Sequence, residues 1–303
     1  MTSAPSATLR LSIVIAAWNS EALLRGCLDS LKGQAETPDT ELIVAANFDG
    51  EIRTACEREF ANLKFLALSS ETTVPRLRSA GIAAARGEIV ALAEDHCSFD
   101  RNWCATLKKA HELPYSVIGG SVENSARQRA LDWAVYFSDY GRYMLPNQPG
   151  EAPFLSGNNV SYKRAALEEV QEQYHDGFFE TSVHAELLRR GYRLYLAPAA
   201  IVYHNKTYAF GDAFAKCYHL ARAFAGRRMF RAGTLKRLTY GAGSLLLPLL
   251  LPARIVVRTL RKKRRAKELC LALPFLVVLM AGWAFGEFCG YLLGEGLSAA
   301  KWR

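Results

Sequence analysis

The sequence lacks the cysteine spacings that mark small disulfide-bonded or zinc-binding domains. Its 303 residues contain seven cysteines, an odd number, and no CxxC occurs among them. This pattern argues against a disulfide framework and a zinc finger, and it favours free thiols in a reducing compartment. The N-terminal stretch MTSAPSATLR also lacks an apolar core of signal-peptide length before Arg10. We therefore expect the first part of the chain to stay in the cytoplasm.

Two common nucleotide-binding loops are missing as well. No GxGxxG follows the first predicted strand, and no GxxxxGK[ST] occurs anywhere, which disfavours dinucleotide oxidoreductases and P-loop NTPases. The net charge is +9, and much of the excess lies between Arg222 and Lys267, beside apolar runs. Because no aromatic-rich basic motif accompanies this segment, it favours an anionic membrane surface as partner, and we expect no nucleic-acid partner.

Short β-branched runs alternate with amphipathic segments through the first hundred residues. The predicted strands cover residues 11–17, 41–46, 63–68 and 88–93, with helices predicted between them. Such alternation is typical of an α/β fold with a mostly parallel sheet and helices on both faces. More strands and helices follow without an evident linker, so residues 1–225 are expected to form one domain.

Residues 226–303 form a basic and apolar region that we expect to associate with a membrane. The apolar run 238–253 contains Pro248 and Pro252 and is short for a span, which needs about 20 residues. The run 269–286 is a better span candidate. Basic residues flank the first run on both sides, so both of its ends prefer the cytoplasmic side. It is expected to re-enter or lie on the membrane, and a purely soluble helical extension is the alternative.

An acidic motif ends the fourth predicted strand. In EIVALAEDHCSFDRNW, residues 88–103, the apolar run stops at Glu94, Asp95 and His96. Buried carboxylates are costly unless they are paired or bind a cation, so these residues indicate a metal or phosphate site. An acidic turn that caps the next helix is the alternative. Ligands of parallel sheets bind beyond the carboxyl ends of strands, and Trp18 and Asn19 follow another such end, which favours the functional interpretation.

Together, these elements resemble the inverting nucleotide-sugar glycosyltransferases of family 2, which have a GT-A fold. The resemblance covers roughly residues 10–225. It rests on the opening strand and helix SIVIAAWNSEALLRGCLDSL, the second strand ELIVAANFDG, the helix and strand RSAGIAAARGEIVALAEDH, the loop FLSGNNVSYKRAAL and the helix FFETSVHAELLRRGYRLYLAP. It implies a GT-A type sheet flanked by helices, followed by the membrane-associated helices.

Three positions depart from the family's pattern. The Asp expected at the end of the second strand falls at Ala46, so Asn47 or Asp49 would have to contact the base or ribose. The second carboxylate of the family's DxD motif is replaced by His96. On the acceptor-side helix, Glu180 takes the place of the catalytic Asp.

The resemblance also implies a donor site, a metal site and a general base. Glu180 is the expected base, with Glu186 as a weaker candidate. The expected cofactor is Mg²⁺ or Mn²⁺, and an imidazole ligand favours Mn²⁺ somewhat. The expected metal ligands are Glu94, His96 and His204, with a turn histidine and a core histidine as alternatives for the last two. The residues expected to bind substrate are Ala16, Trp18, Asn19, Asn47, Asp49, Arg78, Glu94, Asp95, Gly157, Asn158 and Asn159.

The implied activity is transfer of a sugar, with inversion, from a nucleoside diphosphate-sugar to a hydroxyl of a lipid, a lipid-linked sugar or a polysaccharide. The expected location is the cytoplasmic membrane, with the catalytic domain facing the cytoplasm. Two alternatives stay open. One is binding of a nucleotide sugar without turnover, because two acidic motif positions are altered. The other is a membrane-anchored interaction protein that reuses the fold.

Overall fold

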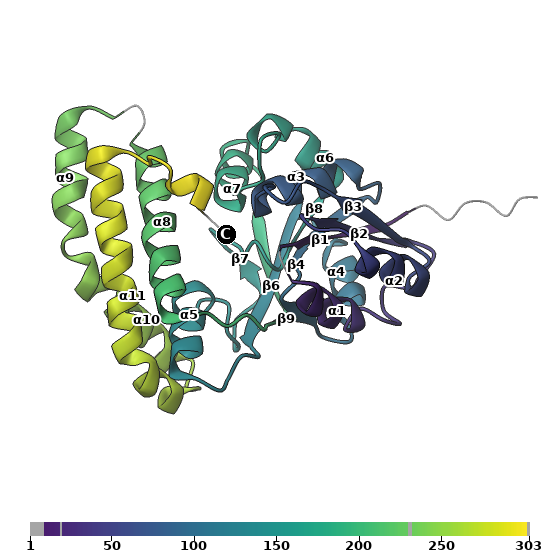
Figure 1. The fold of residues 1–303 in the computed structure, drawn as a ribbon, viewed down its shortest axis with the longest axis horizontal. Helices are drawn as coiled ribbons and strands as arrows, with labels where there is room; N and C mark the ends of the chain where they lie inside the picture. Colours follow the sequence, from purple (N-terminus) through teal and green to yellow (C-terminus); the bar gives the residue numbers. More distant parts are fainter. Residues whose placement is uncertain (1–8, 19, 230–231, 302–303) are drawn as a thin grey trace, which may run out of the picture. The chain divides into compact units, whose positions relative to one another are not determined.

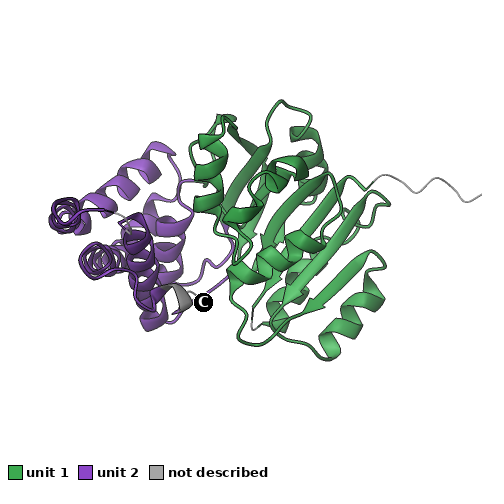
Figure 2. Cartoon of the chain, turned by 90° about the horizontal axis from the view of Figure 1, so that it is seen from above, with its two compact units in different colours: residues 1–123, 143–205 green, residues 124–142, 206–303 purple. Residues whose placement is uncertain are grey.

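The computed structural model describes residues 9–18, 20–229 and 232–301 (Figure 1). The chain forms two compact units, shown in Figure 2. Unit 1 comprises residues 1–123 and 143–205, and unit 2 comprises residues 124–142 and 206–303. This division differs from the predicted boundary at residue 225. The reason is that α5 (Ala130–Asp139) and α8 (Phe210–Arg228) both pack against α11 (Ala266–Leu293) of the C-terminal segment.

Unit 1 is built on one mixed sheet. Its order is β3-β2-β1-β4-β8-β6-β9-β5, and β7 pairs with β9. The strands β1 to β4 pair in parallel, whereas β8 runs antiparallel to both β4 and β6. The strand bounds are β1 Leu11–Ala17, β2 Thr40–Ala46, β3 Leu63–Ala67, β4 Ile89–Glu94, β5 Cys97–Phe99, β6 Val117–Asn124, β7 Gly150–Glu151, β8 Val160–Lys163 and β9 Leu194–His204.

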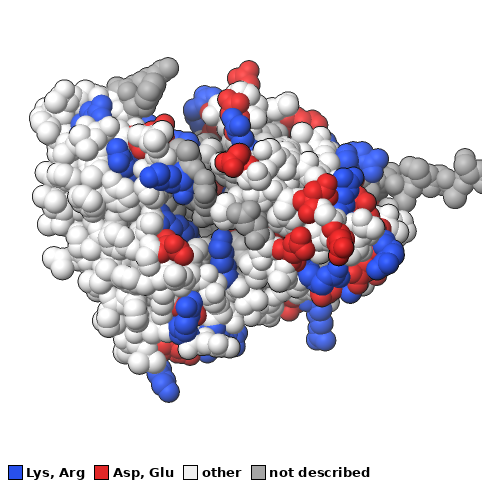
Figure 3. All heavy atoms as spheres, viewed as in Figure 1, with Lys and Arg blue, Asp and Glu red and all other residues white. Residues whose placement is uncertain are grey.

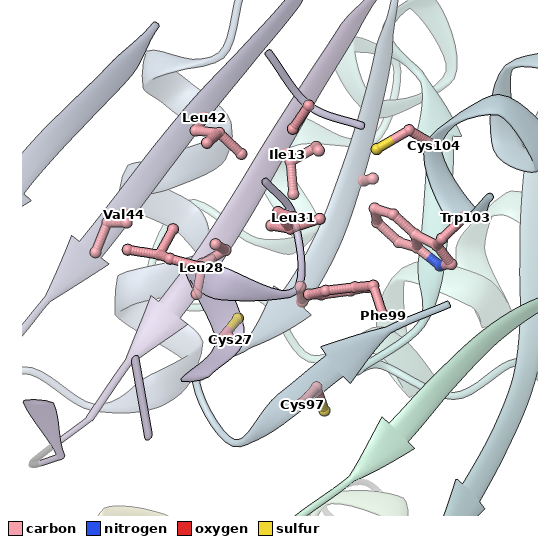
Figure 4. Packing of buried hydrophobic residues seen from close by; sticks show 14 of the residues in the cluster. Ile13, Cys27, Leu28, Leu31, Leu42, Val44, Cys97, Phe99, Trp103 and Cys104 are labelled. Atoms are coloured by element: carbon pink, nitrogen blue, oxygen red, sulfur yellow. The ribbon is translucent and has the colours of Figure 1, made fainter. Parts of the chain in front are cut away.

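Helices cover both faces of this sheet. Their bounds are α1 Glu21–Asp29, α2 Glu51–Glu59, α3 Val74–Ala84, α4 Trp103–Ala110, α6 Arg164–Glu168, η1 Gln171–Gln173 and α7 Glu180–Arg189. Alternate residues of a strand point to opposite faces. Ile13 and Ile15 of β1 therefore join a core with α1, α2 and α4 (Figure 4), while Val14 joins a second core with α3, α6 and α7.

The predicted α/β fold class is confirmed, with one refinement. The sheet is mixed rather than mostly parallel, because the alternating pattern of the sequence extends only through β4. Beyond it, β8 and β6 return antiparallel, and β5 is a three-residue strand too short to give a periodic signal.

Unit 2 is helical and depends on close packing between α8 and α11. Its remaining elements are α9 Thr234–Ser244, α10 Leu247–Arg261 and η2 Ser298–Lys301. Gly282, Gly286 and Gly290 repeat every four residues along α11 and face α8. A Cβ on Gly286 would lie 2.3 Å from the Tyr218 carbonyl oxygen, and one on Gly290 would lie 2.5 Å from that of Arg222. This small-residue spacing lets two helix backbones approach closely, as it does in membrane helix pairs.

Within the described residues, α11 alone is long and apolar enough to cross a membrane by itself. Its mean hydropathy is 2.2 over the most apolar stretch, of which 44% is buried in the protein. The helices α9 and α10 pass the same test only as a pair, and they meet at a bend of 59°. The break lies just before Pro248, where proline favours the start of a new helix.

We predict that Gly120→Ala in β6 will lower the free energy of unfolding by at least about 2 kcal/mol, because an added Cβ would overpack a buried strand. That atom would lie 1.9 Å from the carbonyl oxygen of Ala200 and 2.4 Å from Nδ2 of Asn159. Thermal unfolding of the full chain in detergent measures the change. Gly26→Ala is the control, because the space around Gly26 in α1 is open and alanine favours a helix by up to about 1 kcal/mol. Equal unfolding temperatures for the two variants would contradict this packing.

Candidate functional site

The ends of β1, β2 and β4 bring several predicted site residues to one edge of the sheet. The register pairs Ala16 of β1 with Glu94 of β4 on one side and with Ala45 of β2 on the other. The backbone N–H of Asp95 then donates to the Ala16 carbonyl at 3.2 Å. Ala16 itself is buried, so its contribution to this edge comes from its backbone.

A buried arginine joins two carboxylates at this edge. Arg78 of α3 donates from one terminal nitrogen to Glu94, and from Nη1 to Oε2 of Glu180 at 3.0 Å. The Arg78 side chain is 4% exposed, while the Glu94 and Glu180 side chains are 15% and 21% exposed. The planar guanidinium can serve two carboxylates at once, and this pairing offsets the cost of burying them. The predicted donor-side and acceptor-side carboxylates therefore belong to one cluster.

His96 continues this cluster towards β1. Its Nε2 lies 2.9 Å from Oε2 of Glu94, and its Nδ1 lies 3.2 Å from Oδ1 of Asp95. The other oxygen of Asp95 accepts the backbone N–H of Trp18 at 2.8 Å. An ionised carboxylate can only accept, so both contacts of the ring are hydrogen bonds only when the imidazole carries two protons.

The predicted metal ligands lie together but are not arranged as a protein-only metal site. His204 ends β9, and its ring packs against that of His96 in a T-shaped arrangement with 4.9 Å between centroids. Across the part of the chain that the structure describes, no group of three or more His, Cys, Asp or Glu side chains is placed to hold a metal. Glu94 and His96 contact each other instead. These residues fit a cation held by one or two side chains together with substrate phosphates, a mode common for Mg²⁺.

Glu180, the predicted base, begins α7 and packs against the Gly157 loop. A Cβ on Gly157 would lie 2.8 Å from Cδ of Glu180, so a larger residue there would displace this carboxylate from its position. The N-terminus of a helix stabilises a carboxylate as the anion. Glu186, the weaker candidate, is engaged elsewhere: hydrogen bonds from Arg189 and Arg190 lower the pKa of its carboxyl to about 2.

Asn158 and Asn159 point into the fold rather than towards an open site. The Asn159 amide accepts from Nε1 of Trp103 at 2.9 Å and donates to the carbonyls of Ser121 and Ala200 at 2.8 and 2.9 Å. Asn158 bonds two buried neighbours, Ser156 and Cys97. Each amide is buried and hydrogen-bonded to protein, so their predicted direct contacts with substrate stay a prediction. Both amides tie the loop to the sheet.

The residues predicted to contact the base or ribose differ in accessibility. Asn47 is buried and donates from Nδ2 to the Ser70 carbonyl at 3.0 Å. Asp49 is exposed, with its side chain 56% accessible and 3.7 Å from Arg53. Trp18 is partly buried against the small core that contains Ala16. Asn19 lies outside the described residues.

Tyr162 and His184 form a buried pair near Glu180 that was not predicted from the sequence. The hydroxyl of Tyr162 lies 2.8 Å from Nε2 of His184, which is one turn after Glu180 on α7. Burial raises the pKa of the Tyr162 hydroxyl, and the charge of Glu180 adds to that effect. Burial also lowers the pKa of His184 to about 4. The i, i+4 spacing of Glu180 and His184 is the sequence signal that could have placed them on one helix face.

The fold is of the α/β class with the candidate site at the strand ends, and comparison with known proteins places the chain in a family of transferases. Residues 12–171 match Glycosyl transferase family 2, and the chain belongs to this family. It is 22% identical over 231 residues to "Putative glycosyltransferase EpsH" of Bacillus subtilis (strain 168), covering 68% of this chain and 67% of that protein. The predicted family and enzyme class are thus confirmed.

A solved structure supports the GT-A fold. The mannosyltransferase PcManGT from Pyrobaculum calidifontis, solved in complex with GDP-Man and Mn²⁺, superposes with a TM-score of 0.57. The similarity covers 93% of this chain and 88% of that one at 17% sequence identity. The superposition establishes a shared fold, and at this sequence identity it establishes nothing further.

We predict that acid will destabilise the protein partly through His184. Its pKa of about 4 lies below the ordinary value of 6.5, so the unfolded chain binds more protons between these values. The contribution of His184 to the free energy of unfolding is then greatest above pH 6.5, and it falls by up to about 3 kcal/mol as the pH drops towards 4. His184→Gln should flatten the pH dependence of the free energy of unfolding over this window. An unchanged slope in that variant would contradict the prediction.

Proposed function

We propose that this glycosyltransferase inverts the configuration of the sugar that it transfers. The donor is a nucleoside diphosphate-sugar, and the acceptor is a hydroxyl of a lipid, a lipid-linked sugar or a polysaccharide. The observation that supports this most directly is the Glu94–Arg78–Glu180 cluster, in which one guanidinium links a carboxylate at the strand tip to a carboxylate at the helix start. In the proposed reaction, one of these carboxylates lies beside the leaving group and the other lies beside the attacking hydroxyl.

On the donor side, Glu94 and His96 are the residues that would hold a divalent cation, with His204 beside them. The cation, when bound, offsets the charge that develops on the departing diphosphate. Mg²⁺ or Mn²⁺ suits these ligands, and the solved complex of PcManGT with GDP-Man and Mn²⁺ supports Mn²⁺ by analogy. For His96 to bind a cation through Nε2, its present contact with Glu94 must open.

On the acceptor side, Glu180 takes the proton of the attacking hydroxyl. Its carboxylate is 21% exposed beside Arg78 and so remains reachable. Arg78 fixes the direction in which that carboxylate faces, and Gly157 gives it space. Positioned general bases contribute about 10²–10⁴-fold to turnover.

We therefore predict that Glu180→Gln will lower turnover by at least about 10²-fold, because the amide keeps the shape but cannot accept the proton. Donor affinity should stay within a few-fold. Release of nucleoside diphosphate from a panel of donors with Mn²⁺ measures turnover, and calorimetry measures affinity. Glu186→Gln is the matched control, since Glu186 lies on the same helix but pairs with Arg189 and Arg190. A loss of turnover in Glu186→Gln with Glu180→Gln unaffected would exchange the two roles.

The same assay distinguishes sugar transfer from the alternative function, which is binding of a nucleotide sugar without turnover. One observation favours that alternative: Glu94 and Glu180 already have charged protein partners in this structure. Donor binding without release of nucleoside diphosphate, in the presence of metal and acceptor, would support it over transfer.

We also propose that the enzyme works at the cytoplasmic face of a membrane, held there by unit 2. The exposed large hydrophobic side chains are concentrated in this unit: only Leu113, Phe154 and Leu188 lie in unit 1 among those of the described residues. Figure 3 shows that the visible surface of the unit 2 helices carries few charges. An exposed apolar surface of this extent is a mark of a membrane or protein contact.

We predict that the full chain will sediment with membranes and will require detergent for extraction. The apolar face of α11 provides the reason, since Leu271, Phe275 and Val278 are exposed along it. Extraction with alkaline carbonate and with a mild detergent, followed by sedimentation, measures the association. Full-length protein that remains in the supernatant without detergent would contradict the membrane placement.

A further inference from the structure

The turn between α10 and α11 is the most basic segment of unit 2. Between Arg254 and Glu268 the sequence contains eight Lys and Arg residues and a single carboxylate, that of Glu268. The turn itself is closed by Lys263 and Arg265, whose φ angles are +53° and +58°. Such values are uncommon for residues other than glycine, so the chain turns here at some cost.

The eight cations divide into an inner and an outer group. Lys262 donates to the Arg142 carbonyl at 3.2 Å, and Arg265 pairs with Glu268 at 3.1 Å. Arg258 and Arg264 are also partly buried. The outer group consists of side chains that are exposed and make no hydrogen bond or ion pair with any part of the protein that the structure describes: Arg254, Arg261, Lys263 and Lys267. We call these four residues the cationic turn.

Two residues of the cationic turn border an apolar helix face. At about 100° per residue, the exposed positions Leu249, Leu250, Val257 and Leu260 of α10 lie within an arc of about 100°. Arg254 and Arg261 follow within about 40° of one edge of that arc. The buried positions of the helix, Pro252, Ile255 and Thr259, lie on the opposite side. This pattern is that of a helix that lies in a membrane interface, with arginines at the boundary between hydrocarbon and headgroups.

The other two residues lead into a second apolar face. Lys263 is in the turn, and Lys267 is in the first turn of α11. The exposed residues Leu271, Leu273 and Phe275 follow directly. The four cations therefore stand where two exposed apolar helix faces meet.

We propose that the cationic turn binds the phosphate groups of anionic phospholipids in the bilayer, an inference that rests on the proposed membrane placement of unit 2. A nucleic acid could meet the charges, but its charged backbone would leave the adjoining leucine and phenylalanine side chains in water. A bilayer supplies hydrocarbon for those side chains and phosphate for the cations at adjacent depths. The cations and the apolar side chains thus match the two chemistries that a bilayer presents at adjacent depths.

The expected preference is large enough to measure. A Lys or Arg close to an anionic membrane surface contributes about 1 kcal/mol, which is about a fivefold effect per residue. Four such residues should enrich anionic lipid around the turn by at least about tenfold, after allowing for partial screening. High salt should reduce this enrichment, because it shortens the range of the interaction to about 3 Å at 1 M.

Cys270 allows a direct test on the full chain. It is exposed and three residues after Lys267, whereas the other six cysteines are buried, so a thiol-reactive fluorophore will label it selectively. The labelled protein is reconstituted in phosphatidylcholine nanodiscs that contain a small fraction of a nitroxide-quencher lipid. The quencher lipid is either phosphatidylglycerol or phosphatidylcholine, with the nitroxide at the same acyl position. We expect stronger quenching by phosphatidylglycerol, and we expect high salt to abolish the difference.

The variant Arg254→Gln, Arg261→Gln, Lys263→Gln, Lys267→Gln should lose the preference while it remains in the nanodisc. Its matched control makes the same change in charge at four exposed residues of unit 1 that have no partners among the described residues: Arg58, Lys64, Arg101 and Lys109. Equal quenching by both lipids in the wild type, or a preference retained by the first variant, would overturn the proposal. If the chain enters no nanodisc, the membrane placement and this inference both fall. Binding of an RNA duplex that only the first variant loses, without lipid preference, would assign the cationic turn to nucleic acid.

Discussion

One guanidinium group organises the candidate site of unit 1. Arg78 is buried in α3 and contacts Glu94 at the end of β4 and Glu180 at the start of α7. Neither carboxylate could be buried to this degree without a cationic partner, and the arginine could not be buried without them. The two ion pairs of Arg78 therefore hold the end of β4 and the start of α7 in one arrangement, and the loop at Gly157 packs against Glu180. The geometry proposed for donor and acceptor follows from this constraint.

The two units use opposite solutions to the problem of burying polar groups. Unit 1 gathers its charges at one sheet edge and pairs them, from Glu180 through Arg78 and Glu94 to His96 and Asp95. In unit 2 the glycines of α11 let its backbone pack directly against that of α8. The large apolar side chains of this unit remain exposed in many places. The first solution suits a site that must handle a charged donor. The second suits a surface that a hydrocarbon environment completes.

The pairing of Glu94 with His96 bears on how a cation enters the site. In this structure the two side chains contact each other, so a cation at the proposed site would have to replace that contact. Substrate phosphates that arrive with the metal would supply the remaining ligands. Under the proposed function, donor and cation would therefore bind together, because neither side chain alone would offer the metal a complete site.

The sequence by itself determined the α/β class and the family, and it predicted that the candidate site lies at the carboxyl ends of the strands. It could do so because strand ends and helix starts are local features, and Glu94, Asp95, His96 and Glu180 stand at such ends. Only the tertiary structure decided which side chains face one another. The amides of Asn158 and Asn159 belong to a loop typical of substrate contacts, yet they bond Trp103, Cys97 and backbone carbonyls inside the fold. The packing of α8 against α11 likewise depends on glycines of α11 that meet a helix distant in sequence. The four-residue glycine repeat marks a face of α11 that permits close packing, but the helix that meets this face is decided by packing in three dimensions.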